Sequence, residues 1–165
     1  MKILKFDGAS RGNPGIASSA AVLFESGVVI KDTYQRLSGK RTNNQAEYLG
    51  LIAGLRMALF MGITELQVEG DSKLVIEQLF GNWQCKHPVL KKYYQTAKEL
   101  LKQFQFINGR WIPREQNKEA DAYCNYAIDK GLKSGQEQWF QIDNDIPSKT
   151  SLFQFVEVKS VSKFP

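Results

Sequence analysis

The sequence is poor in the residues that build thiolate or imidazole sites. Among its 165 residues there is one histidine, His87, and there are two cysteines, Cys85 and Cys124. The cysteines have neither metal-ligand spacing nor the density of a disulfide scaffold. We therefore expect reduced thiols in a cytoplasmic protein, and we interpret His87 as a surface residue of the connector that ends at Pro88.

Long apolar runs are also missing. No stretch approaches the roughly 18 uncharged apolar residues of a membrane-spanning helix, because the longest apolar run, 48–61, is interrupted by Arg56. The N-terminal stretch reaches Asp7 too soon to form the apolar centre of a signal peptide. The sequence thus predicts a protein that does not associate with a membrane.

No run of basic residues resembles a nucleic-acid-binding arm, although the formal net charge is +5. The basic residues are scattered along the chain and its C-terminal tail. A basic balance of this kind permits binding to a polyanion, but alone it does not specify one.

The chain has the composition of a globular domain, with 42% hydrophobic residues. Apolar periodicity, glycines and prolines predict nine elements in the order β-β-β-α-β-α-α-β-α. The strands are expected at 2–6, 18–26, 27–37, 64–71 and 104–113, and the helices at 43–62, 72–81, 88–104 and 118–131. This order predicts an α/β fold with a mixed five-stranded sheet, three antiparallel strands followed by parallel strands, flanked by helices.

The C-terminal part of the chain differs in character from the rest. We predict one domain over 1–131 and an extension over 132–165, which is polar except for an alternating, strand-like segment at 152–161. The extension is expected to pack on the domain or on a partner chain, where it would mediate a dimer. Trp139 and Phe140 are interpreted as its packing anchors.

Two acidic residues follow predicted strands. Asp7 ends the first strand and Asp71 ends the fourth, and "DGASRGNPG" (7–15) reads as the loop to the second strand. If the first and fourth strands are parallel neighbours, both carboxylates lie at the same edge of the sheet. Taken singly, Asp7 is equally well explained as a turn residue and Asp71 as a helix N-cap.

Two more acids stand near helix starts. Glu47 is placed in the first turn of the long helix, with Asn43 or Asn44 as its cap, and Asp121 in the first turn of the last helix. The long helix carries few charges, which indicates burial, and a buried charge needs a partner or a metal. Each acid alone also fits a simple interaction with the helix dipole.

Four converging carboxylates cannot all ionise comfortably unless cations neutralise them. An all-oxygen cluster suits hard cations such as Mg²⁺ or Mn²⁺ rather than zinc. A pair of such ions activates water and stabilises the leaving oxygen of a phosphodiester.

Four stretches together resemble the ribonuclease H type 1 family over residues 3–131. They are "DGASRGNPG", "TNNQAEYLGLIAGL", "VEGDSKLVIEQL" and "WIPREQNKEADAYCNYAID". The resemblance implies hydrolysis of the RNA strand of RNA–DNA hybrids, with 5′-phosphate and 3′-hydroxyl products. It implies two Mg²⁺ ions, for which Mn²⁺ would substitute. The implied catalytic residues and metal ligands are Asp7, Glu47, Asp71 and Asp121, with Asp7 shared between both ions, Asp121 on the nucleophile side, and Glu47 and Asp71 on the leaving-group side.

The resemblance also implies contacts with the hybrid. Backbone near the metals, asparagine amides that meet base edges and 2′-hydroxyls, and a lysine that meets a phosphate are the expected groups. They are Gly8, Ala9, Ser10, Asn13, Asn43, Asn44 and Lys73. The asparagines fit turn and capping roles as well.

The sequence departs from the family pattern in two places. The loop "IPREQNKEAD" (112–121) has no histidine, and "GNWQCKHPVLKKYY" (81–94) stands where many members carry a basic protrusion. Short forms of the family share both features, and we expect slower turnover and weaker hybrid binding. Three alternatives stay open: a nucleic-acid-binding module of the same fold with weak activity, a related nuclease acting on double-stranded RNA or on DNA, and a domain whose acids are only helix caps.

Overall fold

The computed structural model describes residues 1–133 and 135–142. Its strands are β1 (Lys2–Gly12), β2 (Gly15–Glu25), β3 (Val28–Arg41), β4 (Glu65–Gly70) and β5 (Phe106–Trp111), and its α-helices are α1 (Asn43–Phe60), α2 (Lys73–Phe80), α3 (Pro88–Leu101) and α4 (Lys118–Lys130). Two short 3-10 turns, η1 (Arg114–Gln116) and η2 (Glu137–Phe140), complete the described part. Each predicted strand and helix is therefore present within these ranges.

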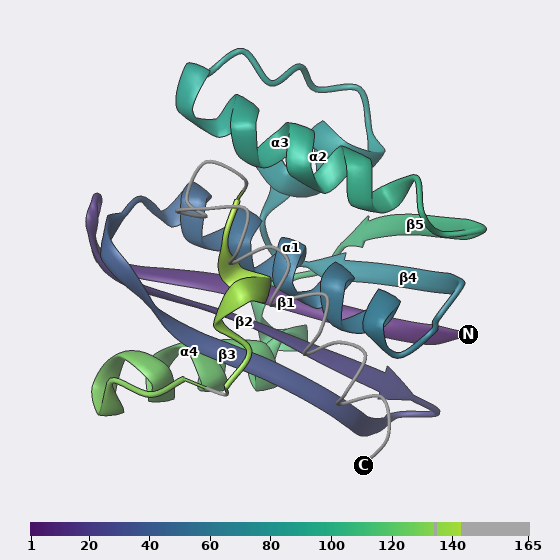
Figure 1. Ribbon diagram of the computed structural model, residues 1–165, viewed down its shortest axis with the longest axis horizontal. Coiled ribbons are helices and arrows are strands. Elements are labelled where there is room, and N and C mark those ends of the chain that lie inside the picture. Colours follow the sequence, from purple (N-terminus) through teal and green to yellow (C-terminus); the bar gives the residue numbers. More distant parts are fainter. Residues whose placement is uncertain (134, 143–165) are drawn as a thin grey trace.

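The strands form one five-stranded sheet in the order β3-β2-β1-β4-β5 (Figure 1). β1, β2 and β3 are antiparallel, whereas β4 pairs parallel with β1, and β5 pairs parallel with β4. The predicted mixed sheet is confirmed. The parallel pairing of β1 with β4 is the feature that brings the two strand-associated acids to one edge.

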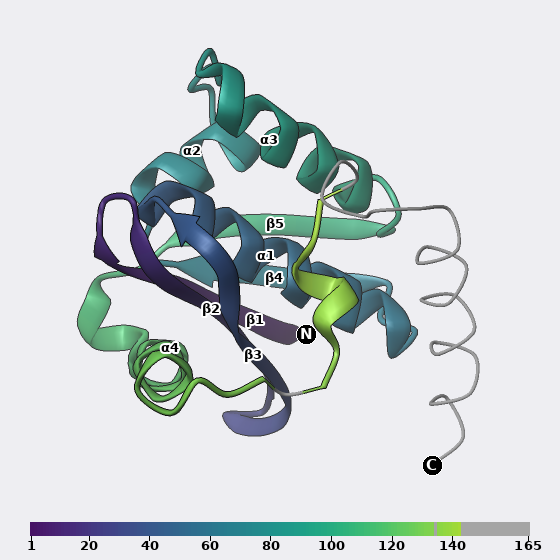
Figure 2. The same ribbon diagram turned by 60° about the vertical axis from the view of Figure 1, so that its left-hand side comes forward.

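Helices cover the sheet on both faces (Figure 2). Consecutive residues of β2 show this directly, because the Ser18 hydroxyl donates to Cys124 O in α4, and the Ser19 hydroxyl donates to Ala46 O in α1. Helices α2 and α3 share the apolar core with α1. No helix in the described ranges is long and apolar enough to cross a membrane.

The N-cap of α1 lies one residue before the asparagines proposed for this role. Thr42 is the N-cap: its hydroxyl accepts from the Gln45 N–H at 3.2 Å, and Gln45 Oε1 accepts from the Thr42 N–H at 2.9 Å. This reciprocal capping box satisfies two backbone donors at once. The prediction of Asn43 or Asn44 as the cap was wrong, and both side chains are exposed in the first turn.

Strand β1 is longer than predicted, so Asp7 lies within the strand and does not end it. Pairing with β2 continues to Gly12↔Gly15, whereas pairing with β4 ends at Phe6↔Gly70. Most of the stretch 7–15 is therefore strand, and the reversal is confined to Asn13 and Pro14. The predicted juxtaposition holds for a different reason: Asp7 follows the last residue of β1 that pairs with β4.

The described part of the C-terminal extension packs on the domain. The Arg36 N–H donates to Leu132 O at 3.0 Å, and the indole of Trp139 packs against Phe60 with ring centroids 5.7 Å apart. Trp139 and Phe140 are both buried. The Arg56 guanidinium on α1 donates to three backbone carbonyls of η2 and its flank, those of Gln138, Trp139 and Gln141. The predicted strand at 152–161 lies outside the described residues, and the division at residue 131 stays a prediction.

Close packing of α1 on the sheet generates a stability prediction. A Cβ on Gly50 would lie 2.4 Å from Asp7 O and 3.0 Å from Ala20 O, whereas one on Gly54 would first meet side-chain atoms of Ala21 and Leu4, both at 2.8 Å. The Leu4 methyl groups are the ends of a flexible side chain and can move aside, although Ala21 Cβ moves only with its strand, whereas both contacts at Gly50 are backbone carbonyl oxygens. We expect Gly50→Ala to lower the free energy of unfolding by about 3 kcal/mol or more, and Gly54→Ala by about 1 kcal/mol.

Chemical denaturation of the two variants measures this difference. Both replace a glycine in the same helix, so the gain in helix propensity is matched. Equal losses in the two variants would contradict the close approach at Gly50.

Candidate metal centre

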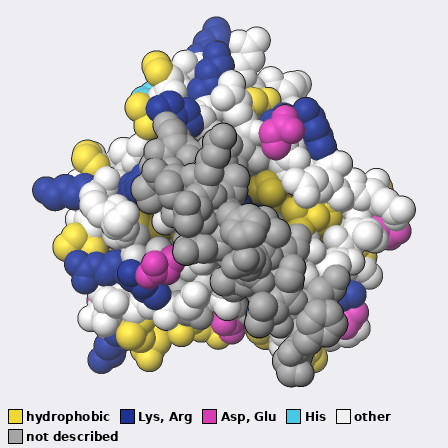
Figure 3. All heavy atoms as spheres, viewed as in Figure 1, with side chains coloured by type: hydrophobic (Ala, Val, Ile, Leu, Met, Phe, Trp, Pro, Cys, Tyr) yellow, Lys and Arg dark blue, Asp and Glu magenta, His cyan; other side chains and the backbone are white. Residues whose placement is uncertain are grey.

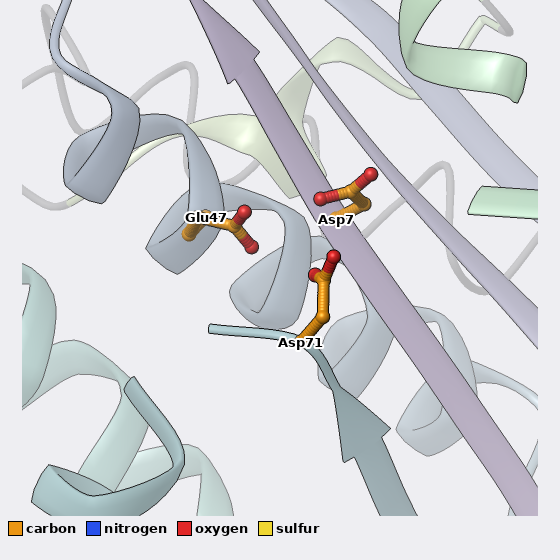
Figure 4. A group of neighbouring side chains, drawn as sticks. All are labelled: Asp7, Glu47 and Asp71. Atoms are coloured by element: carbon orange, nitrogen blue, oxygen red, sulfur yellow. The ribbon is translucent and has the colours of Figure 1, made fainter. Parts of the chain in front are cut away.

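Three carboxylates converge at the edge of the sheet where β1 and β4 part (Figure 4). Asp7, Glu47 and Asp71 each offer an oxygen, and these oxygens all lie within 4.8 Å of one another. They come from β1, from α1 and from the residue after β4. Segments distant in the sequence thus supply one oxygen-only cluster.

The approach of α1 to β1 brings Glu47 beside Asp7. A Cβ added to Gly8 would lie 2.2 Å from Ala46 C and 2.3 Å from Glu47 N, so only glycine permits this contact. The Gly8 N–H in turn donates to Asp7 Oδ1 at 2.9 Å. Glycine at this position therefore sets the distance between two of the acids.

Glu47 does not lie in the first turn of α1, as predicted from the sequence. Because Thr42 is the cap, Glu47 falls in the second turn, and the first turn has no acidic residue. Interaction with the helix dipole, which acts within the first turn, therefore does not explain this carboxylate. Its Oε2 atom is buried and has no hydrogen-bond partner.

Burial shifts the ionisation of this cluster. The pKa of Asp7 is raised to about 7, mainly by loss of solvent; a hydrogen bond with Glu47 lowers it, and the charges of Asp71 and Asp121 contribute to the rise. Burial, followed by the charge of Asp7, raises the pKa of Glu47 well above its ordinary value. Asp7 and Glu47 thus resist ionising together unless a cation compensates their charge.

The donor set fits a hard divalent cation. Carboxylate oxygens are the ligands that Mg²⁺ and Mn²⁺ prefer, and the buried Oε2 of Glu47 is an acceptor that a cation would satisfy. Asp7, Glu47 and Asp71 are the residues that would hold it.

Asp121 lies in the first turn of α4, as predicted, but it does not belong to the group of three. Its Oδ1 is 3.6 Å from Arg114 Nη2, and 31% of its side chain is exposed. Its charge is nevertheless near enough to raise the pKa of Asp7. The structure thus brings three of the four predicted acids together and leaves the fourth beside them.

The residues predicted to contact a hybrid make contacts within the chain. Asn13 Oδ1 accepts from the Asn43 N–H at 3.0 Å, which joins the β1–β2 turn to the start of α1. The Ser10 hydroxyl donates to Arg41 O at 2.7 Å. Gly8 and Ala9 lie on β1, and Asn44 is exposed on α1. Their role in substrate binding stays a prediction.

Lys73 lies on the surface at the start of α2. Its Nζ is 3.9 Å from Glu77 Oε2 and 5.6 Å from the centroid of the Trp111 ring. The Trp111 indole N–H donates to Asp71 O at 3.2 Å, a contact that the sequence analysis missed. His87 is exposed and is the N-cap residue of α3.

Sequence analysis also missed Asn117, which is fully buried beside the cluster. An asparagine directly before a helix is normally interpreted as its cap, yet this side chain makes no capping hydrogen bond. In the sequence, its position four residues before Asp121 was the only indication that it lies near the acids.

On the molecular surface, Lys and Arg side chains stand in separate groups over the face drawn in Figure 3.

Comparison with known proteins agrees with this architecture. The model of the protein family described as "Reverse transcriptase-like" matches residues 5–127. The bifunctional protein Rv2228c of Mycobacterium tuberculosis is 46% identical over 134 residues, which are 80% of this chain and 36% of that protein. Ribonuclease HI of Halobacterium salinarum is 44% identical over 128 residues, which are 75% of this chain and 62% of that protein. The chain thus spans little more than a third of the first relative and less than two thirds of the second.

Solved structures agree as well. The N-terminal RNase H domain of Rv2228c superposes with a TM-score of 0.75 at 46% identity, covering 78% of this chain and 94% of that one. LC11-RNase H1, solved in complex with an RNA/DNA hybrid, gives a TM-score of 0.74 at 33% identity, covering 80% of this chain and 99% of that one. With the matched fold and the carboxylate cluster in place, the chain belongs to the ribonuclease H type 1 family.

Proposed function

We propose that this protein is a metal-dependent endoribonuclease that hydrolyses the RNA strand of RNA–DNA hybrids and leaves 5′-phosphate ends. The observation that carries the proposal is the convergence of Asp7, Glu47 and Asp71 within 4.8 Å, with a buried oxygen of Glu47 left unpaired. The relative solved with an RNA/DNA hybrid supports the choice of substrate.

The four acids are the proposed catalytic residues and ligands of two Mg²⁺ ions, for which Mn²⁺ would substitute. Such ions supply an activated water and stabilise the leaving oxygen of the phosphodiester. Asp7, Glu47 and Asp71 form the described cluster, and Asp121 stands beside it on α4. The protein's own contribution is to hold these oxygens in place from β1, α1, the residue after β4, and α4.

Hybrid binding is proposed for the surface next to the cluster. The proposed contacts are Gly8, Ala9, Ser10, Asn13, Asn43, Asn44 and Lys73. The hydrogen bonds from Asn43 to Asn13 and from Ser10 to Arg41 support this grouping, because they hold the β1–β2 hairpin against the start of α1. Amide groups so held are able to meet the 2′-hydroxyls that distinguish RNA from DNA.

Two buried cysteines, Cys85 and Cys124, are free thiols, which supports the proposed cytoplasmic location. A dimer formed through the extension is kept as a proposal. The rival functions are a nucleic-acid-binding module with weak activity and a nuclease for double-stranded RNA.

Cleavage of end-labelled substrates tests the proposed function. We expect the wild type, in Mg²⁺ or Mn²⁺, to cut the RNA strand of a hybrid and to spare double-stranded RNA and DNA. Asp7→Asn should lower the rate by about a thousandfold or more, because a carboxylate is lost that holds the metal ions, and these ions stabilise charge at the reacting centre. Asp129→Asn, which alters an exposed acid paired with Arg11, is the matched control.

Two results would contradict the proposal. A folded wild type that cuts none of these substrates in either metal would favour the binding module. Faster cleavage of double-stranded RNA than of hybrid would favour the rival nuclease.

The raised pKa of Asp7 predicts a pH dependence of stability in the metal-free protein. The pKa rises from 3.8 to about 7 on folding, so between these values the folded state binds more protons than the unfolded state. The unfolding free energy of the wild type should therefore fall, relative to Asp7→Asn, by about 1.4 kcal/mol per pH unit from pH 4 to 7. Denaturation series in a chelator measure this difference.

Added Mg²⁺ should reverse the trend in the wild type but not in Asp7→Asn, because it binds the ionised cluster. Asp129→Asn should follow the wild type throughout. A wild type whose stability runs parallel to that of Asp7→Asn at every pH would show that Asp7 is not held protonated by burial.

Substitution of Lys73 tests the proposed phosphate contact. Lys73→Ala should weaken hybrid binding by a similar factor for all sequences and reduce the salt slope, log K against log [salt], by about 1. Lys102→Ala removes a lysine of similar exposure from the end of α3, where it pairs with Glu99, and should change neither value. Fluorescence anisotropy over a series of salt concentrations measures both, and an unchanged slope in Lys73→Ala would rule the contact out.

A further inference from the structure

Asn117 is a buried polar residue at the junction of three elements. It has no exposed surface, and it stands at the N-cap position of α4 without capping the helix. Its Oδ1 atom is buried and has no hydrogen-bond partner. Burying an amide in this incomplete way is unfavourable for folding alone, so its contacts need an explanation.

The Asn117 amide donates to two groups at the carboxylate edge. Nδ2 lies 2.8 Å from Phe6 O and 3.4 Å from Asp71 Oδ1. Phe6 immediately precedes Asp7, and Phe6↔Gly70 is the last pair between β1 and β4. One NH₂ group thus spans the point where the two strands part.

The main chain of Asn117 extends the connection to the fourth acid. Its carbonyl accepts from the Asp121 N–H at 3.1 Å and so forms the first helical hydrogen bond of α4. Its own N–H donates to Arg114 O at 2.9 Å, which closes the preceding turn. Asn117 therefore hydrogen-bonds to both acids, to Asp71 through its side chain and to Asp121 through its backbone carbonyl.

We propose that Asn117 is a positioning residue, which holds Asp71 against the end of the β1–β4 ladder and thereby sets the affinity of the carboxylate cluster for its divalent cation. The inference rests on the proposed function for the identity of the site. Donors that fix a metal-binding carboxylate from behind commonly change metal affinity by about 10- to 100-fold when removed. Asn117 contributes no oxygen to the group of three, so it acts through Asp71.

Asn117→Leu tests the proposal, because leucine keeps the shape of asparagine and removes both donors. We expect Mn²⁺ affinity, measured by electron paramagnetic resonance without nucleic acid, to fall by about tenfold or more. Hybrid cleavage should lose kcat at limiting Mn²⁺ with little change in KM for the hybrid, and excess Mn²⁺ should restore most of it. A merely structural role would lower the melting temperature and leave the metal dependence unchanged.

Gln35→Leu is the matched control, since Gln35 is a buried amide on β3 whose Oε1 also lacks a partner. It should keep wild-type Mn²⁺ affinity. If Asn117→Leu does not fold, Asn117→Ala, measured below its melting temperature, replaces it and should show the same loss.

Wild-type Mn²⁺ affinity in the folded Asn117 variant would overturn the proposal, and so would an equal loss in Gln35→Leu. Because Mn²⁺ binding is measured without substrate, the proposed function fails separately. A wild type that binds Mn²⁺ in an Asn117-dependent manner but does not cut hybrid would support the positioning role and contradict the nuclease.

Discussion

Mutual repulsion among Asp7, Glu47 and Asp71 is the constraint on which the functional interpretation depends. Their oxygens lie within 4.8 Å of one another at an edge where water is largely excluded from two of them. In such surroundings like charges interact strongly, and the cluster is stable only with bound protons or a bound cation. A site of this kind destabilises the folded state in its ionised, metal-free form. A bound cation relieves the repulsion, and this relief favours cation binding.

The fold holds the acids close in spite of this repulsion. Parallel pairing places the ends of the β1–β4 ladder side by side, and α1 approaches β1 so closely that glycine is required at positions 8 and 50. Helix α1 is buried along most of its length, so its position is set by the core rather than by the site. The apolar contacts of α1 thus offset the destabilisation of the folded state that repulsion among the carboxylates causes.

Sequence reasoning was most successful where a local pattern determines the topology. The alternation of elements predicted the mixed sheet, and the parallel neighbours then predicted that Asp7 and Asp71 meet. It was wrong about the end of β1, because glycine and serine after Asp7 were interpreted as a turn although they pair with β2. It also missed Thr42 as the cap of α1, although the pattern Thr-x-x-Gln was available.

Asn117 shows what a single sequence does not reveal. Its local position indicates a helix cap, and only the meeting of β1, β4 and α4 turns its side chain toward Phe6 O and Asp71. The burial that raises the pKa of Glu47 is likewise a tertiary property. Residues whose role depends on three distant segments are therefore recognised only once the fold is known.

The most direct test of the account is the number of protons released when the cluster binds its cation. Calorimetric titration of the protein with Mg²⁺ or Mn²⁺, in buffers of different ionisation enthalpy, measures this number at each pH. Proton release should be larger at pH 6 than at pH 8, because burial holds protons on the cluster until a cation displaces them. Binding without proton release at pH 6 would contradict it.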